Sequence, residues 1–190
     1  MTKPGLARPA GGLAPLPSDG AAKEPPAGRN LLFLREEELR LAQDLLFFGY
    51  RDFTAGADAI LAGLGMGRAH HRVLHFVGRR PGITVGDLLG ILAITKQSLG
   101  RVLTPLVEDG YVTQAPGRTD RRQRLLSLTP KGTALERSLY ERQRETVMQA
   151  YREAGPQAVE GFRRVMRGLM GAEARAALAR LEGAGGEAAG

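Results

Sequence analysis

The sequence predicts a mainly α-helical protein with one small β-hairpin, and three observations support this fold class. Apolar residues recur at helical spacing through most of the chain after residue 30. Residues 111–128 interrupt that pattern with two short strand-like runs around a basic Pro/Gly turn. The length of 190 residues is enough for one sizeable domain or for two small lobes that share a core.

Composition narrows the class of protein. Cysteine and tryptophan are absent, so disulfides and thiol chemistry are excluded, and we expect a reducing, cytoplasmic location. No apolar run approaches the roughly 18 residues that a membrane span needs. Gly and Pro interrupt the N-terminus, where a signal peptide needs an apolar stretch. We therefore expect no membrane partner.

The net charge of +7 is concentrated in one part of the chain. Residues 67–131 carry 11 Lys+Arg and 4 Asp+Glu, which leaves 16 basic and 16 acidic residues elsewhere. A local basic excess favours a polyanionic partner such as nucleic acid. The alternative is a solvated basic surface without a partner.

The chain begins with a segment that differs from the rest. Residues 1–30 are rich in Gly, Pro and Ala and are predicted to be a disordered leader, because they bury too little apolar surface to offset ordering entropy. Residues 31–66 follow as an N-terminal helical dimerisation segment. Its helix over residues 31–54 has apolar residues on more than one face, namely Leu45, Leu46, Phe47 and Phe48. We interpret the second face as a subunit contact; the alternative is burial in the chain's own core.

A Gly- and Ala-rich stretch and a histidine-rich helix come next. Residues 55–67 superficially resemble a phosphate-binding loop, but they follow no strand, so we interpret them as a connection between helices. Residues 68–80 form a helix with His70, His71 and His75. His71 and His75 have the i, i+4 spacing of two metal ligands. With no cysteine and no further histidine, we favour half-buried histidines in an inter-helix groove and expect no metal or cofactor.

Residues 85–110 show the pattern of a helix-turn-helix. A short helix over residues 85–92 has Thr84 as its N-cap, and a very short link leads to a longer amphipathic helix. Thr95 is a good N-cap for that helix and Gly110 a good C′ residue. The apolar stripe is Leu99, Val102, Leu103, Leu106 and Val107. Off the stripe, at the helix start, lie Lys96, Gln97, Ser98 and Arg101, which are residue types that contact bases in a major groove.

A basic hairpin follows the second helix. Residues 111–115 and 124–128 are short strand candidates, and the turn between them carries Arg118, Arg121 and Arg122. A helix-turn-helix followed by such a hairpin is a winged helix, so we assign residues 67–131 to a winged helix-turn-helix, DNA-binding lobe. One local rule is broken: Pro105 lies inside the second helix, where it removes a backbone hydrogen bond and can cost roughly 3 kcal/mol.

The C-terminal part is helical again. Thr129 followed by Pro130 is a strong helix start, and the helix is predicted to run to about residue 153, where Gly155-Pro156 breaks it. A further helix covers residues 156–170, and the Ala-rich residues 172–181 can extend it. We assign residues 132–182 to a helical dimerisation base and residues 183–190 to a flexible tail.

Two segments together resemble the MarR family of winged-helix regulators. They are ITVGDLLGILAITKQSLGRVLTPLVEDGYV and TDRRQRLLSLTPKG, the second of which matches a wing signature through Asp120, Arg122, Leu128, Thr129 and Gly132. The resemblance covers roughly residues 33–170. LLFFGYRDFT, GRAHHRVLHFVGRRPG and AYREAGPQAVEGFRRVM resemble the PetP-type subgroup more narrowly.

The resemblance implies a homodimer that binds double-stranded DNA, with two lobes on successive major grooves of a pseudo-palindrome. Arg122 would enter the minor groove and Asp120 would orient it. Gln97, Ser98 and Arg101 would face bases, and Lys96 a phosphate. Thr95 is the fifth residue of this predicted DNA-binding site on the recognition helix. For Arg118, Arg121 and Arg124 solvation or generic phosphate contact is the favoured interpretation.

The resemblance also implies a small amphipathic or aromatic effector between the dimer base and the DNA-binding lobe. The candidate residues there are Phe47, Tyr50, Arg51, His70, His71 and His75, with ordinary inter-helix packing as the alternative for each. Peroxide sensing through cysteine is excluded.

The sequence therefore predicts a dimeric, sequence-specific transcriptional regulator modulated by an effector, with a histidine-based metal sensor as the alternative. We find no nucleophile–base set, no paired carboxylates in a marked loop and no phosphate loop in context, so an enzyme is not expected.

Overall fold

The computed structural model describes residues 32–117 and 119–187, and the side chains of these residues as far as 183. The predicted leader, the end of the predicted tail and Arg118 lie outside the described residues. The described residues fall into two units, which divide between Leu41 and Ala42. The first contributes a short 3-10 turn, Leu32–Leu34, and the start of the first helix. The elements are α1 Glu36–Ala62, α2 Arg68–Arg79, β1 Ile83–Thr84, α3 Val85–Leu92, α4 Lys96–Glu108, β2 Val112–Pro116, β3 Arg124–Leu128, α5 Pro130–Leu169 and α6 Ala172–Glu187.

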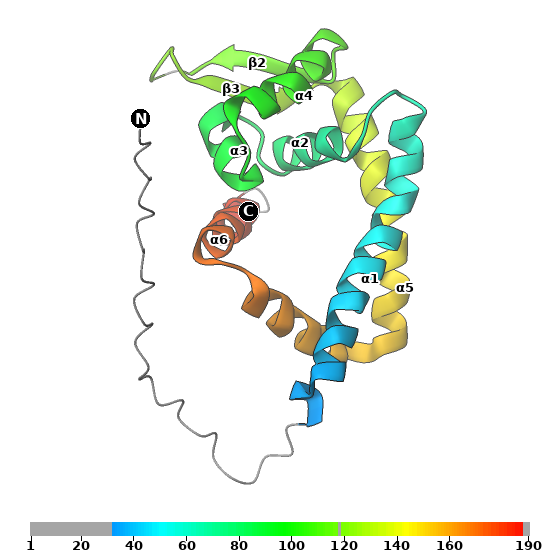
Figure 1. Cartoon of the computed structure of the whole chain (residues 1–190). Helices are drawn as coiled ribbons and strands as arrows, with labels where there is room; N and C mark the ends of the chain where they lie inside the picture. The colour runs from blue at the N-terminus through cyan, green and yellow to red at the C-terminus, as the bar shows by residue number, and fades with distance from the viewer. Residues whose placement is uncertain (1–31, 118, 188–190) are drawn as a thin grey trace, which may run out of the picture. The chain divides into compact units, whose positions relative to one another are not determined.

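Helices α2, α3 and α4 and the small sheet form the winged helix-turn-helix lobe that the sequence predicts (Figure 1). Its core is aliphatic, since Leu74, Leu88, Leu99, Leu106 and Leu126 are completely or almost completely buried. These side chains come from α2, α3, α4 and β3, so the helix-turn-helix and the hairpin share one core.

The sheet is antiparallel and has the order β1-β3-β2. Val112 pairs with Leu128 and Pro116 with Arg124 across the hairpin, while Ile83 of β1 pairs with Leu126 on the other side of β3. The sequence does not predict β1, because a strand of two residues has no periodicity to detect. With β1 in place, β3 is the central strand and its Leu126 is fully buried.

Helix α1 is longer than predicted. It continues through residues 55–62, for which the sequence predicts a connection, and the actual connection is the short stretch from Gly63 to Gly67. Glycine lowers helix propensity by about 1 kcal/mol per residue, but Ala57 and Leu61 are both fully buried one turn apart in this stretch. Burial of this face therefore outweighs the local propensity.

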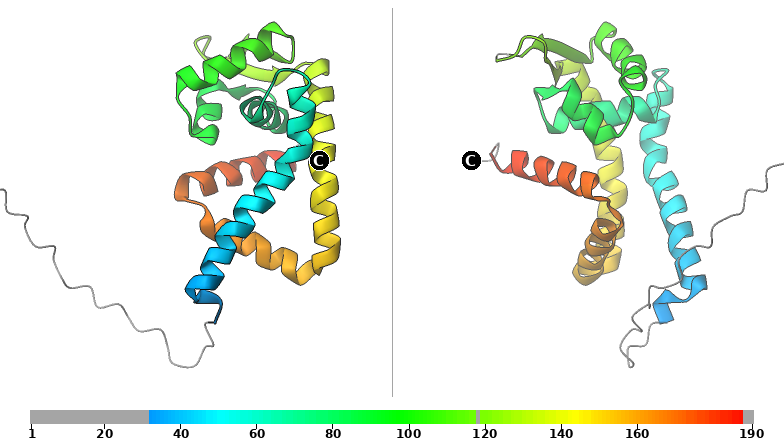
Figure 2. Two further views of the ribbon diagram at one scale, coloured as in Figure 1. Left: turned by 45° about the vertical axis from the view of Figure 1, so that its right-hand side comes forward. Right: turned by 60° about the vertical axis from the view of Figure 1, so that its left-hand side comes forward.

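From residue 42 onward, α1 lies beside the long helix α5 (Figure 2). Grooves between these two helices are lined by residues of both. The break predicted at Gly155-Pro156 is confirmed, because Gly155 has the non-helical angles φ 78° and ψ 168° inside α5. After the break, α6 turns back and contacts α3, with Ala177 and Leu181 nearly buried. It reaches Glu187, so the first residues of the predicted flexible tail are helical.

The expected caps are confirmed. The hydroxyls of Thr84, Thr95 and Thr129 accept hydrogen bonds from the amides of Asp87, Ser98 and Gly132, and each cap begins a helix. Helix α4 continues through Pro105 to Glu108, so this proline does not end the helix. Within the described residues, no helix is both long enough and apolar enough to cross a membrane.

The start of α5 packs closely against the end of the helix-turn-helix. The hydroxyl of Thr129 donates to the carbonyl oxygen of Gly110 at 2.7 Å and accepts from the amide of Gly132 at 3.0 Å. Gly132 is buried, and a Cβ atom at this position would collide with the carbonyl oxygen of Tyr111. Only glycine allows α5 to begin so close to the strand.

We therefore expect Gly132→Ala to lower the free energy of unfolding by about 2–3 kcal/mol, because the backbone of Tyr111 must move to admit the methyl group. Urea denaturation followed by circular dichroism measures this. Gly90→Ala is the matched control, since nothing lies within 4 Å of a Cβ there. We expect Gly90→Ala to raise the free energy of unfolding by about 0.5–1 kcal/mol. Equal effects of the two substitutions would contradict the steric argument.

Candidate nucleic-acid interface

The first two turns of α4 present their polar side chains to solvent. Thr95, Lys96, Gln97, Ser98 and Arg101 are all exposed, whereas Leu99 and Leu103 on the other face are buried. The hydroxyl of Thr95 also donates to Oγ of Ser98 at 3.0 Å. Thr95 and Ser98 are thus engaged in capping, and Lys96, Gln97 and Arg101 have the freest polar groups.

The far end of α4 is tied to the start of α5. Nζ of Lys131 donates to the carbonyl oxygen of Asp109 at 2.8 Å and lies 4.1 Å from the ring centroid of Tyr111. Gly110 has φ 73°, as expected of a residue that ends a helix in the left-handed conformation. These contacts fix the C-terminal end of α4 to the sheet and to α5.

The hairpin of β2 and β3 carries the predicted wing residues beside α4 (Figure 1). Arg121, Arg122 and Arg124 are exposed. Oδ1 of Asp120 accepts a hydrogen bond from the backbone amide of Arg122 at 2.9 Å. Asp120 therefore shapes the turn through the backbone of Arg122.

The turn is closed by further backbone hydrogen bonds. The amide of Gly117 donates to the carbonyl oxygen of Gln123 at 3.0 Å, and the amide of Gln123 donates to that of Asp120 at 3.1 Å. A Cβ atom at Gly117 would lie 2.6 Å from the carbonyl oxygen of Asp120. The tight turn thus requires glycine at position 117, and these bonds hold the backbone that carries Arg121 and Arg122.

The cations of this surface are unpaired. Among the described residues, no carboxylate forms an ion pair with Lys96, Arg101, Arg121, Arg122 or Arg124. In contrast, Arg137, Arg142 and Arg144 on α5 each pair with a glutamate of the same helix. Positive charge without a carboxylate partner is therefore present on α4 and the wing, where it is available to a polyanion.

The six residues predicted to line an effector pocket do not meet in one cavity. Tyr50 lines an apolar groove of about 700 Å³ between α1 and α5, and His75 lines a different groove of about 710 Å³. Phe47 is 74% exposed on α1. Nε of Arg51 pairs with Asp52 at 2.8 Å, and this carboxylate raises the pKa of Arg51. His70 accepts a hydrogen bond from the amide of Gly67 at 3.1 Å and so closes the start of α2.

His71 and His75 are partly buried on α2. Burial lowers the pKa of His71, with Asp58 opposing the shift. Burial, Arg79 and His71 together lower the pKa of His75 to about 4. Nδ1 of His75 lies 4.0 Å from Oε1 of Glu136. In the part of the chain that is described, no group of three His, Asp or Glu side chains converges for a metal ion.

The groove that contains His75 has a lining that the sequence does not predict. It is formed by aromatic and apolar side chains with two arginines, namely Phe53, Tyr140, Gln143, Arg144, Val147, Met148, Tyr151 and Arg152. Most of these lie on α5 at spacings of three and four residues, so they share one helix face. The repeat of aromatic and basic residues at this spacing is the feature of the sequence that could have predicted this lining.

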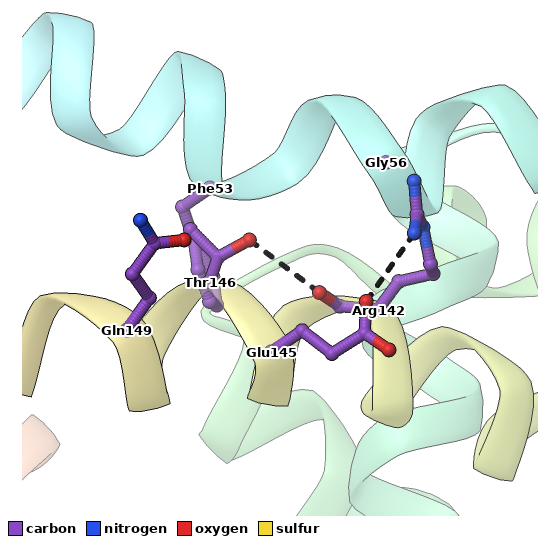
Figure 3. A pocket seen from close by; sticks show the side chains of 6 residues that line it. All are labelled: Phe53, Gly56, Arg142, Glu145, Thr146 and Gln149. Carbon is purple, nitrogen blue, oxygen red and sulfur yellow. Dashed lines mark hydrogen bonds and ion pairs between the residues drawn. The ribbon is translucent and has the colours of Figure 1, made fainter.

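A smaller, polar pocket of about 300 Å³ lies between α1 and α5 (Figure 3). Its Arg142 pairs with Glu145 at 3.3 Å, and the hydroxyl of Thr146 donates to the carbonyl oxygen of Arg142 at 3.5 Å. Gly56 faces the Arg142 side chain. Because the arginine is already paired within the pocket, this site offers little to an anionic ligand.

Comparisons with known proteins agree with the lobe described above. A family model described as the MarR family matches residues 64–123. The HTH-type transcriptional regulator PetP of Rhodobacter capsulatus is 53% identical over 145 residues, which are 76% of this chain and 87% of PetP.

Solved structures share the fold. FabT of Streptococcus pneumoniae in complex with DNA has a TM-score of 0.59 and 18% identity over 69% of this chain and 94% of its own. A mutant of MarR from E. coli, complexed with operator DNA, has a TM-score of 0.57 and 22% identity over 73% of this chain and 99% of its own. With PetP so similar over most of both chains, this chain belongs to the MarR family of winged helix-turn-helix transcriptional regulators.

Proposed function

We propose that this regulator acts as a homodimer that binds a pseudo-palindromic DNA operator, with one lobe on each half-site. The observation that carries the proposal is the set of unpaired cations on the first two turns of α4 and on the wing. Arg101 and Gln97 contact base edges in the major groove, and Lys96 contacts a phosphate. Arg122 enters the adjacent minor groove from the wing. FabT and the MarR mutant, which have the same fold, are in complexes with DNA.

Exposed apolar side chains support the homodimer. On α1, Leu45, Phe47 and Phe48 are exposed by 64%, 74% and 56%, and on the C-terminal part of α5, Phe162, Val165 and Leu169 are exposed by 51%, 63% and 60%. So much exposed apolar surface is unusual for a monomer. A second copy that covers these faces would set the spacing of the two lobes, and half-sites one helical turn apart require about 34–36 Å.

In this proposal, a small-molecule effector that binds the groove around His75 regulates DNA binding. The groove around His75 joins α1, α2 and α5 and combines aromatic walls with Arg152, which forms no ion pair with any described carboxylate. These groups suit a small aromatic carboxylate, because arginine donates charge-assisted hydrogen bonds to carboxylates. A ligand that binds one spacing of the lobes more tightly would change the fraction of dimers able to bind both half-sites.

The dimer predicts that Val165→Asp combined with Leu169→Asp yields a folded monomer, because both side chains are already exposed within one chain. Light scattering after size exclusion measures the mass, and circular dichroism checks the fold. Operator affinity should fall by at least about 100-fold, since one lobe alone loses the second half-site. Arg137→Asp adds the same acid at an exposed position early in α5 and should remain dimeric. A double variant that stays dimeric contradicts this interface.

The two DNA contacts predict different losses. A high-affinity site is first selected from random duplexes, and binding is then measured by fluorescence anisotropy at several salt concentrations. Arg122→Ala should weaken binding and lower the slope of log affinity against log salt, because a cation leaves the groove. Arg101→Ala should relax base preference at one position per half-site by about 1–3 kcal/mol.

Each variant is the other's control, since both remove one arginine from the same surface. An unchanged affinity and salt slope for Arg122→Ala would show that the wing assignment is wrong. An unchanged base preference in Arg101→Ala would show that Arg101 does not contact bases.

The effector groove predicts that benzoate or 2-naphthoate binds more tightly as the pH falls from about 7 to about 5.5. The reason is that the bound carboxylate raises the pKa of His75 above its low value in the free protein, so binding takes up a proton. Calorimetric titration measures this. Arg152→Ala should weaken binding about tenfold, and His75→Gln should abolish the pH dependence. The neutral analogue benzamide is the control, and equal binding of benzamide and benzoate would contradict an anion site.

A further inference from the structure

We propose that Arg72, on α2, is a positioning residue for DNA reading: it holds the turn of the helix-turn-helix and so sets the orientation in which α4 meets the bases. The inference rests on the proposed role of α4 in base contact. Arg72 was not among the candidate residues from the sequence, and it lies outside the polar surface of α4 and the wing.

The contact that carries the inference is specific. Nη2 of Arg72 donates a hydrogen bond of 2.9 Å to the carbonyl oxygen of Leu92, the last residue of α3. The last four carbonyls of a helix lack partners within it, and α3 has only eight residues. Arg72 thus donates a charge-assisted hydrogen bond to a carbonyl that has no partner within its own helix.

The backbone next to this contact is strained. Ala93 has φ 51° and ψ 46°, the left-handed conformation, and it is the only non-glycine residue with positive φ in the described part of the chain. This conformation is unfavourable for a residue with a Cβ atom, and glycine usually occupies it. An external contact that fixes the Leu92 carbonyl therefore helps to maintain a turn that Ala93 alone favours weakly.

The turn leads directly into the reading residues. Only Ala93 and Ile94 separate Leu92 from Thr95, the N-cap of α4, and Lys96, Gln97 and Ser98 form the first helical turn. A change at Leu92 therefore reaches these side chains through a very short link. Bidentate base contacts depend on geometry, so a small rotation of α4 weakens them more than it weakens contacts to phosphates.

Helix α2 is a firm support for this contact. Val73, Leu74 and Val77 are fully or almost fully buried, so the helix that carries Arg72 is fixed in the core. Arg72 forms no ion pair with any described carboxylate, in contrast to Arg68 one turn earlier, which pairs with Asp58 at 2.8 Å. The guanidinium of Arg72 therefore has the Leu92 carbonyl, and no carboxylate, as its described partner.

The test compares Arg72→Ala, Arg72→Lys and the matched control Arg68→Ala, which removes the same charge from the same helix. Affinity for the selected operator and for a scrambled duplex is measured by anisotropy against salt. We expect Arg72→Ala to bind the operator about tenfold more weakly, with scrambled-duplex affinity and salt slope unchanged. Hydrogen exchange of the amides of residues 93–98 should accelerate. Arg72→Lys, which can still donate to the carbonyl, should recover most of the operator affinity.

Several outcomes overturn the proposal. Unchanged operator affinity in Arg72→Ala does so, and so does failure of a folded Arg72→Lys to recover affinity. Equal losses on both duplexes with a smaller salt slope would instead identify a phosphate contact. Should Arg72→Ala not fold, Arg72→Met, whose unbranched side chain has no hydrogen-bond donor, replaces it, with the same expected loss. If Arg101→Ala and Gln97→Ala also leave base preference unchanged, the fault lies with the proposed role of α4 and not with Arg72 alone.

Discussion

The close approach of Gly132 to the carbonyl of Tyr111 is the constraint on which the rest of the described structure depends. It brings the first turn of α5 against the end of α4 and the start of β2, and Thr129 completes the contact by bonding both sides of it. Because α5 runs on from there to its break at Gly155, this one junction couples the winged-helix lobe to the part of α5 that lines the grooves against α1. A larger residue at position 132 would alter that coupling.

Helix α4, our proposed recognition helix, is held from two directions. Lys131 and Thr129 bind the carbonyls at its C-terminal end, while its apolar stripe, with Leu99 and Leu106 buried, fixes its rotation on the lobe. In our inference, Arg72 restrains the N-terminal end through the turn. A reading surface fixed in this way loses little conformational entropy when DNA binds, which favours affinity and specificity together.

Local chemistry explains what the sequence could predict and what it could not. Caps at Thr84, Thr95 and Thr129 and the break at Gly155-Pro156 are encoded by neighbouring residues, so their places were predictable. The strand β1 and the last turns of α1 depend on burial against distant elements. The sequence of β1 is too short to show a strand pattern, and the composition of the end of α1 favours a connection over a helix. The grouping of His75 with Arg144 and Arg152 likewise requires α2 and α5 to meet, which no spacing within one helix discloses.

Helix α2 connects the two regions that regulation would need to couple. His75 lines the groove between α1, α2 and α5, and Arg72, one turn earlier on the same helix, bonds the turn before α4. Because the buried face of α2 is packed into the lobe, the helix moves as a unit and cannot absorb a displacement locally. A ligand in the groove can therefore act on DNA reading only to the extent that it binds one placement of α2 better than another. That requirement makes the difference in the ligand's affinity for the two placements of α2, and not its affinity alone, the property that determines whether it regulates.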